Sequence, residues 1–393
     1  MKDIVILADF CGPLDGTFNS RFLYLADMLS DDNDVEIITS DFNHGEKKYF
    51  SGEIEKHTYA ITLLHEGSYS KNVCLKRFLA HLVWGSNVKK YLNKRKKPDV
   101  IYAAIPPLTG PFSAAQYCRK NKIKFVIDVQ DLWPEAFKMV FNIPIISDIV
   151  FMPFSFLANS IYRNAKEICA VSKSYADRAI RAKNNECSGT VVYLGTDLET
   201  FDSYADQTPV IEKKIDEIWI GYCGTLGASY DITCVIDALE TLGNDKVKFI
   251  VMGDGPRRVE FEEYAEMKKV PAIFTGRLSY EKMCSTLVHC DIAVNPITKG
   301  AAQSIINKHA DYAASGLPVI STQESMEYRD LVDEYDMGFN CNNSDCLDLA
   351  EKIKILISDE ELRKSKGRNA RRCAEERFDR KFTYQKLVNA ILK

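Results

Sequence analysis

Short apolar runs alternate with amphipathic stretches along the whole chain, and this alternation restricts the possible folds more than any other feature. Runs such as IVILADF, VEIITSDF and KFVIDVQ are rich in β-branched and aromatic residues, which is typical of buried strands. Longer amphipathic segments lie between them, for example at 19–30 and 111–121. Because buried parallel strands need helical crossovers, the pattern predicts an α/β fold with doubly wound parallel sheets.

The same pattern runs twice through the 393 residues. A polar stretch at 200–217 is typical of a linker, and strand-like runs then resume with IWIGYCG, VKFIVMG and CDIAVNP. We therefore expect two Rossmann-like domains that face each other across a cleft, one at 1–205 and one at 206–375. The last helix, at 376–393, is expected to pack back on the first domain.

Charge and cysteine content argue against several classes of protein. The net charge of −4 argues against general nucleic-acid binding. The N-terminus MKDIVILADF has no charged and then apolar export signal and already has the pattern of a first strand. Twelve cysteines form no CxxC pair and no Cys/His ligand spacing, which favours reduced, buried thiols. We expect a cytosolic, metal-independent protein without a cofactor.

Two segments point to a membrane surface. Residues 71–97 hold nine Lys or Arg and no acid, with an apolar stripe between the basic positions formed by Leu75, Phe78, Leu79, Leu82 and Val83. A basic amphipathic helix is suited to an anionic membrane surface, but a domain helix with a solvated basic face has the same pattern. The apolar segment 139–158 is interrupted by Pro144 and Pro153, so we expect a docking segment or a core element rather than a spanning helix.

Glycine-bearing loops follow several predicted strands, where open α/β sheets bind ligands. Such loops let backbone N–H groups approach a phosphate or a sugar closely. The donors and small residues that we place there are Gly12, Gly16, Gly224, Thr225, Gly253 and Arg277. Another strand ends at Gln130 and Asp131, of which Asp131 is either a helix N-cap or a contact to a reacting hydroxyl.

The segment QSIINKHADYAASGLPVI predicts one helix from Gln303 that ends before Gly316 and leads into a buried strand. Polar residues then share one helical face, at Ser304, Asn307, Lys308 and Asp311. The free N–H groups at the positive end of this helix would bind a pyrophosphate, with Lys308 as a nearby cation. Asp311 would accept hydrogen bonds from a ribose diol. The alternative is a solvated face with a Lys–Asp pair.

These residues resemble the family 4 retaining glycosyltransferases of the GT-B fold, particularly those that build bacterial capsule, O-antigen or exopolysaccharide. The likeness covers nearly the whole chain, and its motifs are DLWPE at 131–135, GDGP at 253–256, TGRLSYEKM at 275–283 and NKHADYAASGLPVI at 307–320. The resemblance implies an N-terminal acceptor-binding domain and a C-terminal nucleotide-sugar-binding domain.

The resemblance also implies individual roles. Lys308 would contact the donor phosphates, Asp311 the ribose, and Gln303 the transferred sugar. The backbone amides of Ser304, Ile305 and Ile306 would also contact the donor phosphates. The chain departs from the family pattern at several places: Thr225 and Tyr230 stand where an Arg and a Lys are common, Gln130 replaces a frequent His, and Gln303 and Asp311 replace two glutamates.

We therefore expect a hexosyltransferase-type enzyme that moves a sugar from a nucleoside-diphosphate sugar, for which we favour UDP, to a lipid-linked saccharide in bacterial surface polysaccharide synthesis. Asp131, Gln130 and Gln303 are its expected catalytic residues, and it would work peripherally on the inner face of the plasma membrane. The alternatives are a non-hydrolysing nucleotide-sugar epimerase and a non-enzymatic nucleotide-sugar-binding scaffold.

Overall fold

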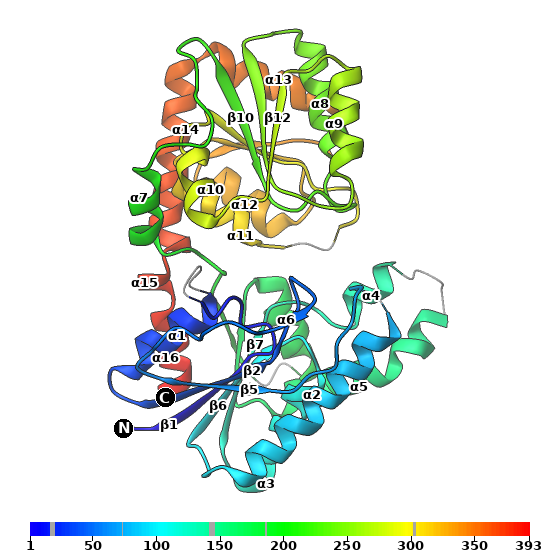
Figure 1. The fold of residues 1–393 in the computed structure, drawn as a ribbon, viewed down its shortest axis with the longest axis vertical. Helices are drawn as coiled ribbons and strands as arrows, with labels where there is room; N and C mark the ends of the chain where they lie inside the picture. Colours follow the sequence, from blue (N-terminus) through cyan, green and yellow to red (C-terminus); the bar gives the residue numbers. More distant parts are fainter. Residues whose placement is uncertain (16–19, 73, 141–145, 185–186, 302–303) are drawn as a thin grey trace. The chain divides into compact units, whose positions relative to one another are not determined.

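The computed structural model describes residues 1–15, 20–72, 74–140, 146–184, 187–301 and 304–393, without the side chains of 138–140, 146 and 148. The chain divides into two compact units (Figure 1). Unit 1 is Met1–Val192 together with Tyr384–Lys393, and unit 2 is Tyr193–Thr383. Two of the predicted site residues, Gly16 and Gln303, lie outside the described residues.

Unit 1 is built on a parallel sheet of seven strands in the order β5-β2-β1-β6-β7-β8-β9. Its strands are β1 (Asp3–Leu7), β2 (Asp34–Ser40), β5 (Ala60–Leu64), β6 (Val100–Ile105), β7 (Lys124–Val129), β8 (Glu167–Ala170) and β9 (Gly189–Val191). A short antiparallel pair, β3 (Phe42–Asn43) and β4 (Lys48–Tyr49), follows β2.

Helices cover both faces of this sheet, because successive strand residues point to opposite faces. Ile4 and Ile6 of β1 pack in the core beneath α1 and α16, whereas Val5 and Leu7 pack in the core beneath α2, α3 and α5 (Figure 1). The helices of unit 1 are α1 (Arg21–Ser30), α2 (Leu75–Lys94), α3 (Thr109–Asn121), α4 (Glu135–Val140), α5 (Ile146–Asn164), α6 (Lys173–Ala182) and α16 (Gln385–Leu392).

Unit 2 repeats this architecture with a parallel sheet of six strands in the order β12-β11-β10-β13-β14-β15. Its strands are β10 (Ile218–Cys223), β11 (Val247–Met252), β12 (Ala272–Gly276), β13 (Ile292–Asn295), β14 (Val319–Ser321) and β15 (Gly338–Asn340). Its helices are α7 (Leu198–Ala205), α8 (Ile232–Leu242), α9 (Arg258–Met267), α10 (Tyr280–Leu287), α11 (Asn307–Ala314), α12 (Met326–Glu334), α13 (Cys346–Ser358), α14 (Glu360–Cys373) and α15 (Arg380–Thr383), with a π-helical turn at Ala374–Phe378. The predicted fold class, two doubly wound parallel α/β units, is confirmed.

The division between the units differs from the expected boundaries at 205/206 and 375/376. Helix α7 belongs to unit 2 because it packs on α10, where the ring centroids of Tyr204 and Tyr280 are 6.2 Å apart. At the other end the chain returns to unit 1 only at Tyr384, and Leu387 and Ile391 of α16 enter the core beneath α1.

Each of the twelve cysteines, all in the described part of the chain, is a free thiol. Among the residues that the structure describes, no helix combines the length and the apolar character needed to cross a bilayer.

Candidate functional site

Glycines line the carboxyl ends of three neighbouring strands in unit 2. Gly224 follows β10 with a φ of +136°, a conformation that side-chain-bearing residues rarely adopt. A Cβ on Gly253, after β11, would lie 1.8 Å from the carbonyl oxygen of Gly224. Gly253 also forms a bridge to Gly276 at the end of β12. The absence of side chains therefore lets three strand ends meet closely, which exposes backbone at one edge of the sheet.

Lys308 places its ammonium group beneath this edge. A Cβ on Gly224 would lie 3.0 Å from Lys308 Nζ. The ammonium sits 4.1 Å from the ring centroid of Tyr222 and 3.9 Å from that of Tyr230. It has no hydrogen-bond partner among the described residues, and burial lowers the pKa of Lys308 to about 7. A buried ammonium whose partners are aromatic faces, next to a glycine loop, is a site prepared for an anion.

Asp311 lies one turn further along α11 and is already engaged. The hydroxyl of Tyr280 donates to Asp311 Oδ1 at 2.9 Å and lies 2.7 Å from Thr196 Oγ1. Burial raises the pKa of Asp311 to about 6, against the opposing effects of Tyr280 and Arg380. The predicted ribose contact remains a prediction, and in this structure the carboxylate is held by Tyr280.

The predicted helix from Gln303 is wrong at its start, because α11 begins only at Asn307. Ile306 is extended, with φ −115° and ψ 165°, and its N–H donates to Nδ1 of His309 at 3.2 Å. Ser304 Oγ donates instead to Glu327 Oε2 at 3.1 Å. Ser304 therefore does not share a helical face with Lys308, and Ile305 is buried.

The remaining predicted donor contacts of unit 2 lie at its surface. Asn307 is exposed at the first position of α11, and Thr225 is exposed directly after Gly224. Arg277 is exposed after Gly276, whose φ is +75°. All three border the same strand ends as Lys308, so they stay candidates for ligand contact.

In unit 1 the predicted residues at the end of β7 bind within their own unit. Asp131 accepts the N–H of Leu132 at 2.8 Å and the indole N–H of Trp133 at 3.2 Å, and burial raises its pKa. Because α4 begins only at Glu135, Asp131 does not cap it.

Gln130 and Gly12 have structural partners too. Gln130 Nε2 donates to Asp128 Oδ2 at 2.9 Å, and Asp128 forms a buried ion pair with Arg21 at 2.7 Å. Gly12 has a φ of +103°, which explains a glycine in the loop after β1.

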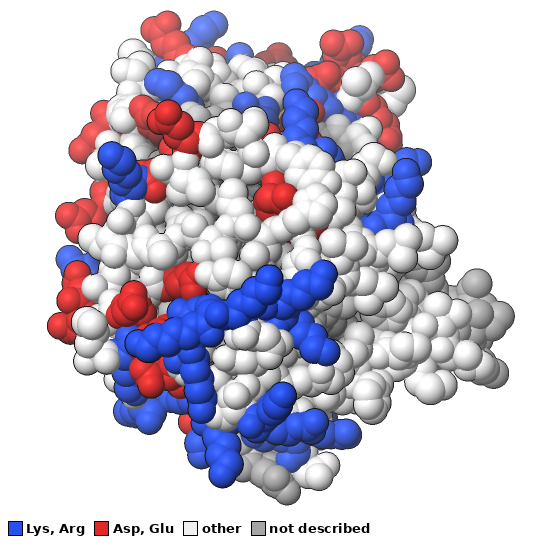
Figure 2. All heavy atoms as spheres, turned by 60° about the horizontal axis from the view of Figure 1, so that its bottom comes forward, with Lys and Arg blue, Asp and Glu red and all other residues white. Residues whose placement is uncertain are grey.

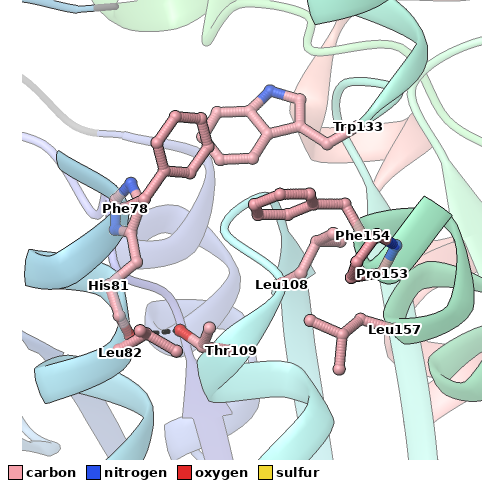
Figure 3. Close-up of a pocket in the computed structure, with 9 residues that line it drawn as sticks. All are labelled: Phe78, His81, Leu82, Leu108, Thr109, Trp133, Pro153, Phe154 and Leu157. Carbon is pink, nitrogen blue, oxygen red and sulfur yellow. Dashed lines mark hydrogen bonds between the residues drawn. The ribbon is translucent and has the colours of Figure 1, made fainter. Parts of the chain in front are cut away.

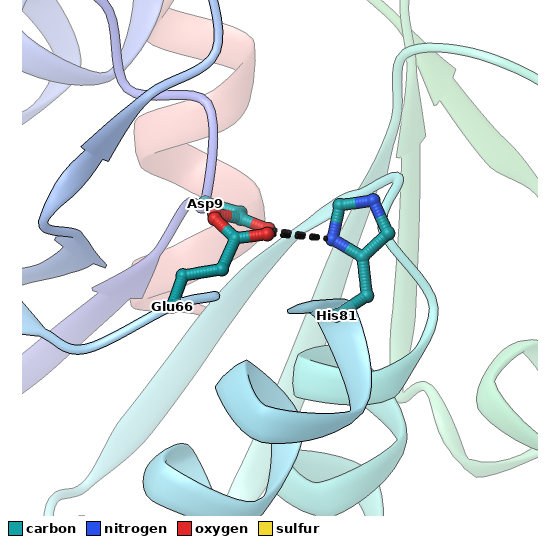
Figure 4. A group of neighbouring side chains, drawn as sticks. All are labelled: Asp9, Glu66 and His81. Carbon is teal, nitrogen blue, oxygen red and sulfur yellow. Dashed lines mark ion pairs between the residues drawn. The ribbon is translucent and has the colours of Figure 1, made fainter. Parts of the chain in front are cut away.

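A buried cluster that sequence reasoning missed lies in the same unit (Figure 4). Asp9 comes from the loop after β1, Glu66 follows β5, and His81 lies on α2. His81 Nδ1 is 3.0 Å from Glu66 Oε1 and 3.5 Å from Asp9 Oδ2. Within the described residues neither oxygen of Asp9 has a hydrogen-bond partner, and burial raises the pKa of Asp9 to about 7. No local spacing could reveal this group, because its members are far apart in the chain.

One imidazole and two carboxylates are a possible metal-ligand set, and their ligand atoms lie within 4.8 Å of one another. The neighbouring Arg77 argues against that use. Its Nε–H donates to His81 Nε2 at 3.2 Å, and a guanidinium group can only donate. His81 Nε2 must then supply the lone pair, which leaves the ring hydrogen on Nδ1, facing the carboxylates. The cluster therefore fits a shared proton better than a metal ion.

Comparison with known proteins agrees with the architecture. Residues 217–359 match the family described as glycosyl transferases group 1. The probable glycosyltransferase WbjE of Pseudomonas aeruginosa is 23% identical over 298 residues, 72% of each chain. The uncharacterized glycosyltransferase MJ1069 of Methanocaldococcus jannaschii is 23% identical over 245 residues, 59% of this chain and 60% of that protein. The match to MJ1069 thus spans less than two thirds of that relative's length.

Solved structures show the same fold. Anabaena Alr3699/HepE in complex with UDP has a TM-score of 0.70 at 18% identity, over 98% of both chains. Sucrose-phosphate synthase from Thermosynechococcus elongatus has a TM-score of 0.75 at 14% identity, over 99% of this chain and 98% of that one. The fold is therefore that of the GT-B class. Within that class, the family match and the curated relatives support a glycosyltransferase.

Proposed function

We propose that the protein is a retaining glycosyltransferase of the family 4 type, which moves a sugar from a UDP-sugar to a lipid-linked saccharide in bacterial surface polysaccharide synthesis. The observation that carries this proposal is the buried ammonium of Lys308 beside the Gly224 loop. An unpaired buried cation at the carboxyl ends of parallel strands is where a diphosphate gains most from binding. Anabaena Alr3699/HepE, a solved structure of the same fold, is in complex with UDP-glucose, which supports UDP as the nucleotide of the donor.

The chemistry follows from charge. As the bond between sugar and diphosphate breaks, negative charge grows on the leaving group. Lys308 and the exposed Arg277 are cationic donors in unit 2 that can stabilise it. With these cations present we propose a metal-independent reaction, in which the leaving phosphate itself accepts the proton of the acceptor hydroxyl.

The membrane side of the proposal rests on α2. Its first half exposes the apolar side chains of Leu75, Leu79, Leu82 and Val83 together with Lys76. Exposed lysines follow in the second half and just beyond it, at Lys89, Lys90, Lys94, Lys96 and Lys97. Figure 2 shows lysine and arginine side chains gathered beside an area without charge. Apolar insertion next to a basic group suits an anionic bilayer, and we propose peripheral attachment on the cytosolic side.

Helix α5 contributes to the same kind of surface. Ile149, Val150, Met152 and Phe156 are each more than half exposed. Single exposed apolar residues are common, but a group of this size marks a surface that meets lipid or protein.

The proposal is tested with purified protein, a panel of nucleotide sugars and lipid-diphosphate saccharide acceptors. We expect UDP to bind, one UDP-sugar to be consumed only when acceptor is present, and the product to keep the donor's anomeric configuration. Lys308→Ala should lose binding and transfer, whereas Lys354→Ala, an exposed lysine of unit 2, should keep both. Full transfer by Lys308→Ala would overturn the site assignment.

The epimerase remains an alternative because a putative UDP-N-acetylglucosamine 2-epimerase from Listeria monocytogenes shares the fold, with a TM-score of 0.62 at 10% identity. An isomeric UDP-sugar formed without acceptor would identify that activity. Binding of UDP-sugars without turnover on any lipid acceptor would instead favour the scaffold.

A further inference from the structure

A cavity of about 200 Å³ lies in unit 1 between α2, the start of α3 and α5 (Figure 3). Its lining is almost entirely apolar and consists of Phe78, His81, Leu82, Leu108, Thr109, Trp133, Pro153, Phe154 and Leu157. The two polar side chains turn their polar atoms to protein partners. The hydroxyl of Thr109 donates to the backbone oxygen of His81, and the His81 nitrogens face Arg77 and Glu66. The cavity therefore presents hydrocarbon to whatever enters it.

Residues at the edge of the cavity belong to the exposed apolar surface of the same helices. Leu82 of α2 lines the cavity and is 58% exposed, and Pro153 of α5 lines it from the other side and is also exposed. Their neighbours Leu79 and Phe156 are 60% and 66% exposed. A hydrocarbon chain that lies on the exposed apolar surface of α2 and α5 can thus enter the cavity without crossing a polar layer.

We propose that this cavity binds the hydrocarbon chain of the lipid phosphate that carries the acceptor saccharide. This inference rests on the proposed lipid-linked acceptor. The occupant is an anionic lipid because the exposed end of α2 is basic, with Lys89, Lys90 and Lys94 within about 18 Å of Leu82 along the helix axis. The hydrocarbon chain of the lipid would leave the bilayer and enter the cavity. Its binding there would fix which end of the acceptor faces the protein.

The volume of the cavity limits the length of the alkyl chain that it can hold. At roughly 30 Å³ for a group the size of a water molecule, the cavity holds about seven methylene groups. Each methylene transferred from water should strengthen binding about fourfold until the cavity is full. Affinity should then stop rising with chain length, whereas partition into an open apolar surface would continue to rise.

The test measures binding of butyl, hexyl, octyl and decyl phosphate to the full chain by calorimetry, below their micelle concentrations and without donor. We expect about fourfold per methylene up to roughly seven carbons, then no further gain. Leu157→Trp, which fills the cavity, should abolish the length dependence, and Leu157→Ala should extend it to longer chains. Leu347→Ser, at an exposed leucine of α13 in unit 2, should leave the length dependence unchanged.

Three results would overturn the inference: affinity that rises steadily through decyl phosphate, a length dependence that survives Leu157→Trp, or equal affinity for alkyl trimethylammonium ions. Hydrogen exchange of the unit 1 sheet in each variant serves as the folding control, because the proposed UDP site lies in unit 2. If transfer to lipid acceptors occurs without a length limit in binding, the cavity inference fails and the proposed function stands. If the length limit is found but no donor is ever consumed, the proposed function fails instead.

Discussion

Replacing Lys308 by methionine should stabilise the free protein and weaken nucleotide binding at the same time. Burial lowers the pKa of Lys308 from 10.5 to about 7. At about 1.4 kcal/mol per pKa unit, the folded protein bears a cost of about 5 kcal/mol when the ammonium is charged. Methionine has a similar length and no charge, so Lys308→Met removes the cost without opening a large cavity.

The pH dependence of the stability follows from whether the folded or the unfolded protein carries the proton on Lys308. Below pH 7 both states are charged and the folded state bears the full cost. Between pH 7 and 10.5 the unfolded chain binds the proton that the folded protein has released, so stability rises with pH. The advantage of Lys308→Met should therefore be about 4 kcal/mol at pH 7 and fall below about 1 kcal/mol at pH 10.

Nucleotide binding should become weaker in Lys308→Met, although the free protein becomes more stable. A diphosphate beside Nζ restores the ordinary pKa of Lys308, so at pH 8 binding of UDP should take up about 0.9 proton. Loss of a charge-assisted contact of about 2–3 kcal/mol predicts a 30- to 150-fold weaker affinity in Lys308→Met.

Urea unfolding with peptide-resolved hydrogen exchange reports the stability of unit 2, and calorimetry in buffers of different ionisation enthalpy reports proton uptake. The matched control is Lys354→Met, an exposed lysine whose removal should change neither quantity. The reasoning is refuted if Lys308→Met is no more stable than the parent at pH 7. It is also refuted if UDP binds to both with equal affinity and no proton uptake.

Three further predictions concern other parts of the chain. Gly253→Ala forces a Cβ to within 1.8 Å of the Gly224 oxygen, so UDP affinity and the melting temperature of unit 2 should both fall; retention of both would contradict the strand-end geometry. The raised pKa of Asp9 means that the folded protein favours the protonated carboxyl, so the parent should lose stability as pH rises through about 7. Asp9→Asn should not show this loss. An equal change in the free energy of unfolding between pH 5 and pH 8 in parent and variant would disprove this. Lys89→Glu with Lys90→Glu should reduce sedimentation with anionic vesicles at low salt, and the difference should shrink as salt is raised; undiminished binding would exclude α2 as the membrane contact.

The sequence pattern predicted the features that depend on residues close together in the chain. Strand and helix types follow from the period of apolar residues, and the glycine-rich strand ends and Lys308 were found from their spacing. The start of α11 was placed too early, because the sequence cannot show that Ser304 bonds to Glu327 and that His309 accepts the N–H of Ile306. A helix end depends on which partner satisfies its first N–H groups, and here that partner is a side chain fixed by packing.

The sequence by itself therefore determined the doubly wound fold and its occurrence in two successive units. It also indicated that Lys308 lies near the glycine-bearing ends of strands. Only the tertiary structure decided that Tyr222 and Tyr230 enclose the ammonium, and that Asp9, Glu66 and His81 meet. The physical reason is the same in both cases. Periodicity describes contacts within one element, whereas burial, pKa shifts and cavities arise between elements whose residues are far apart in the chain.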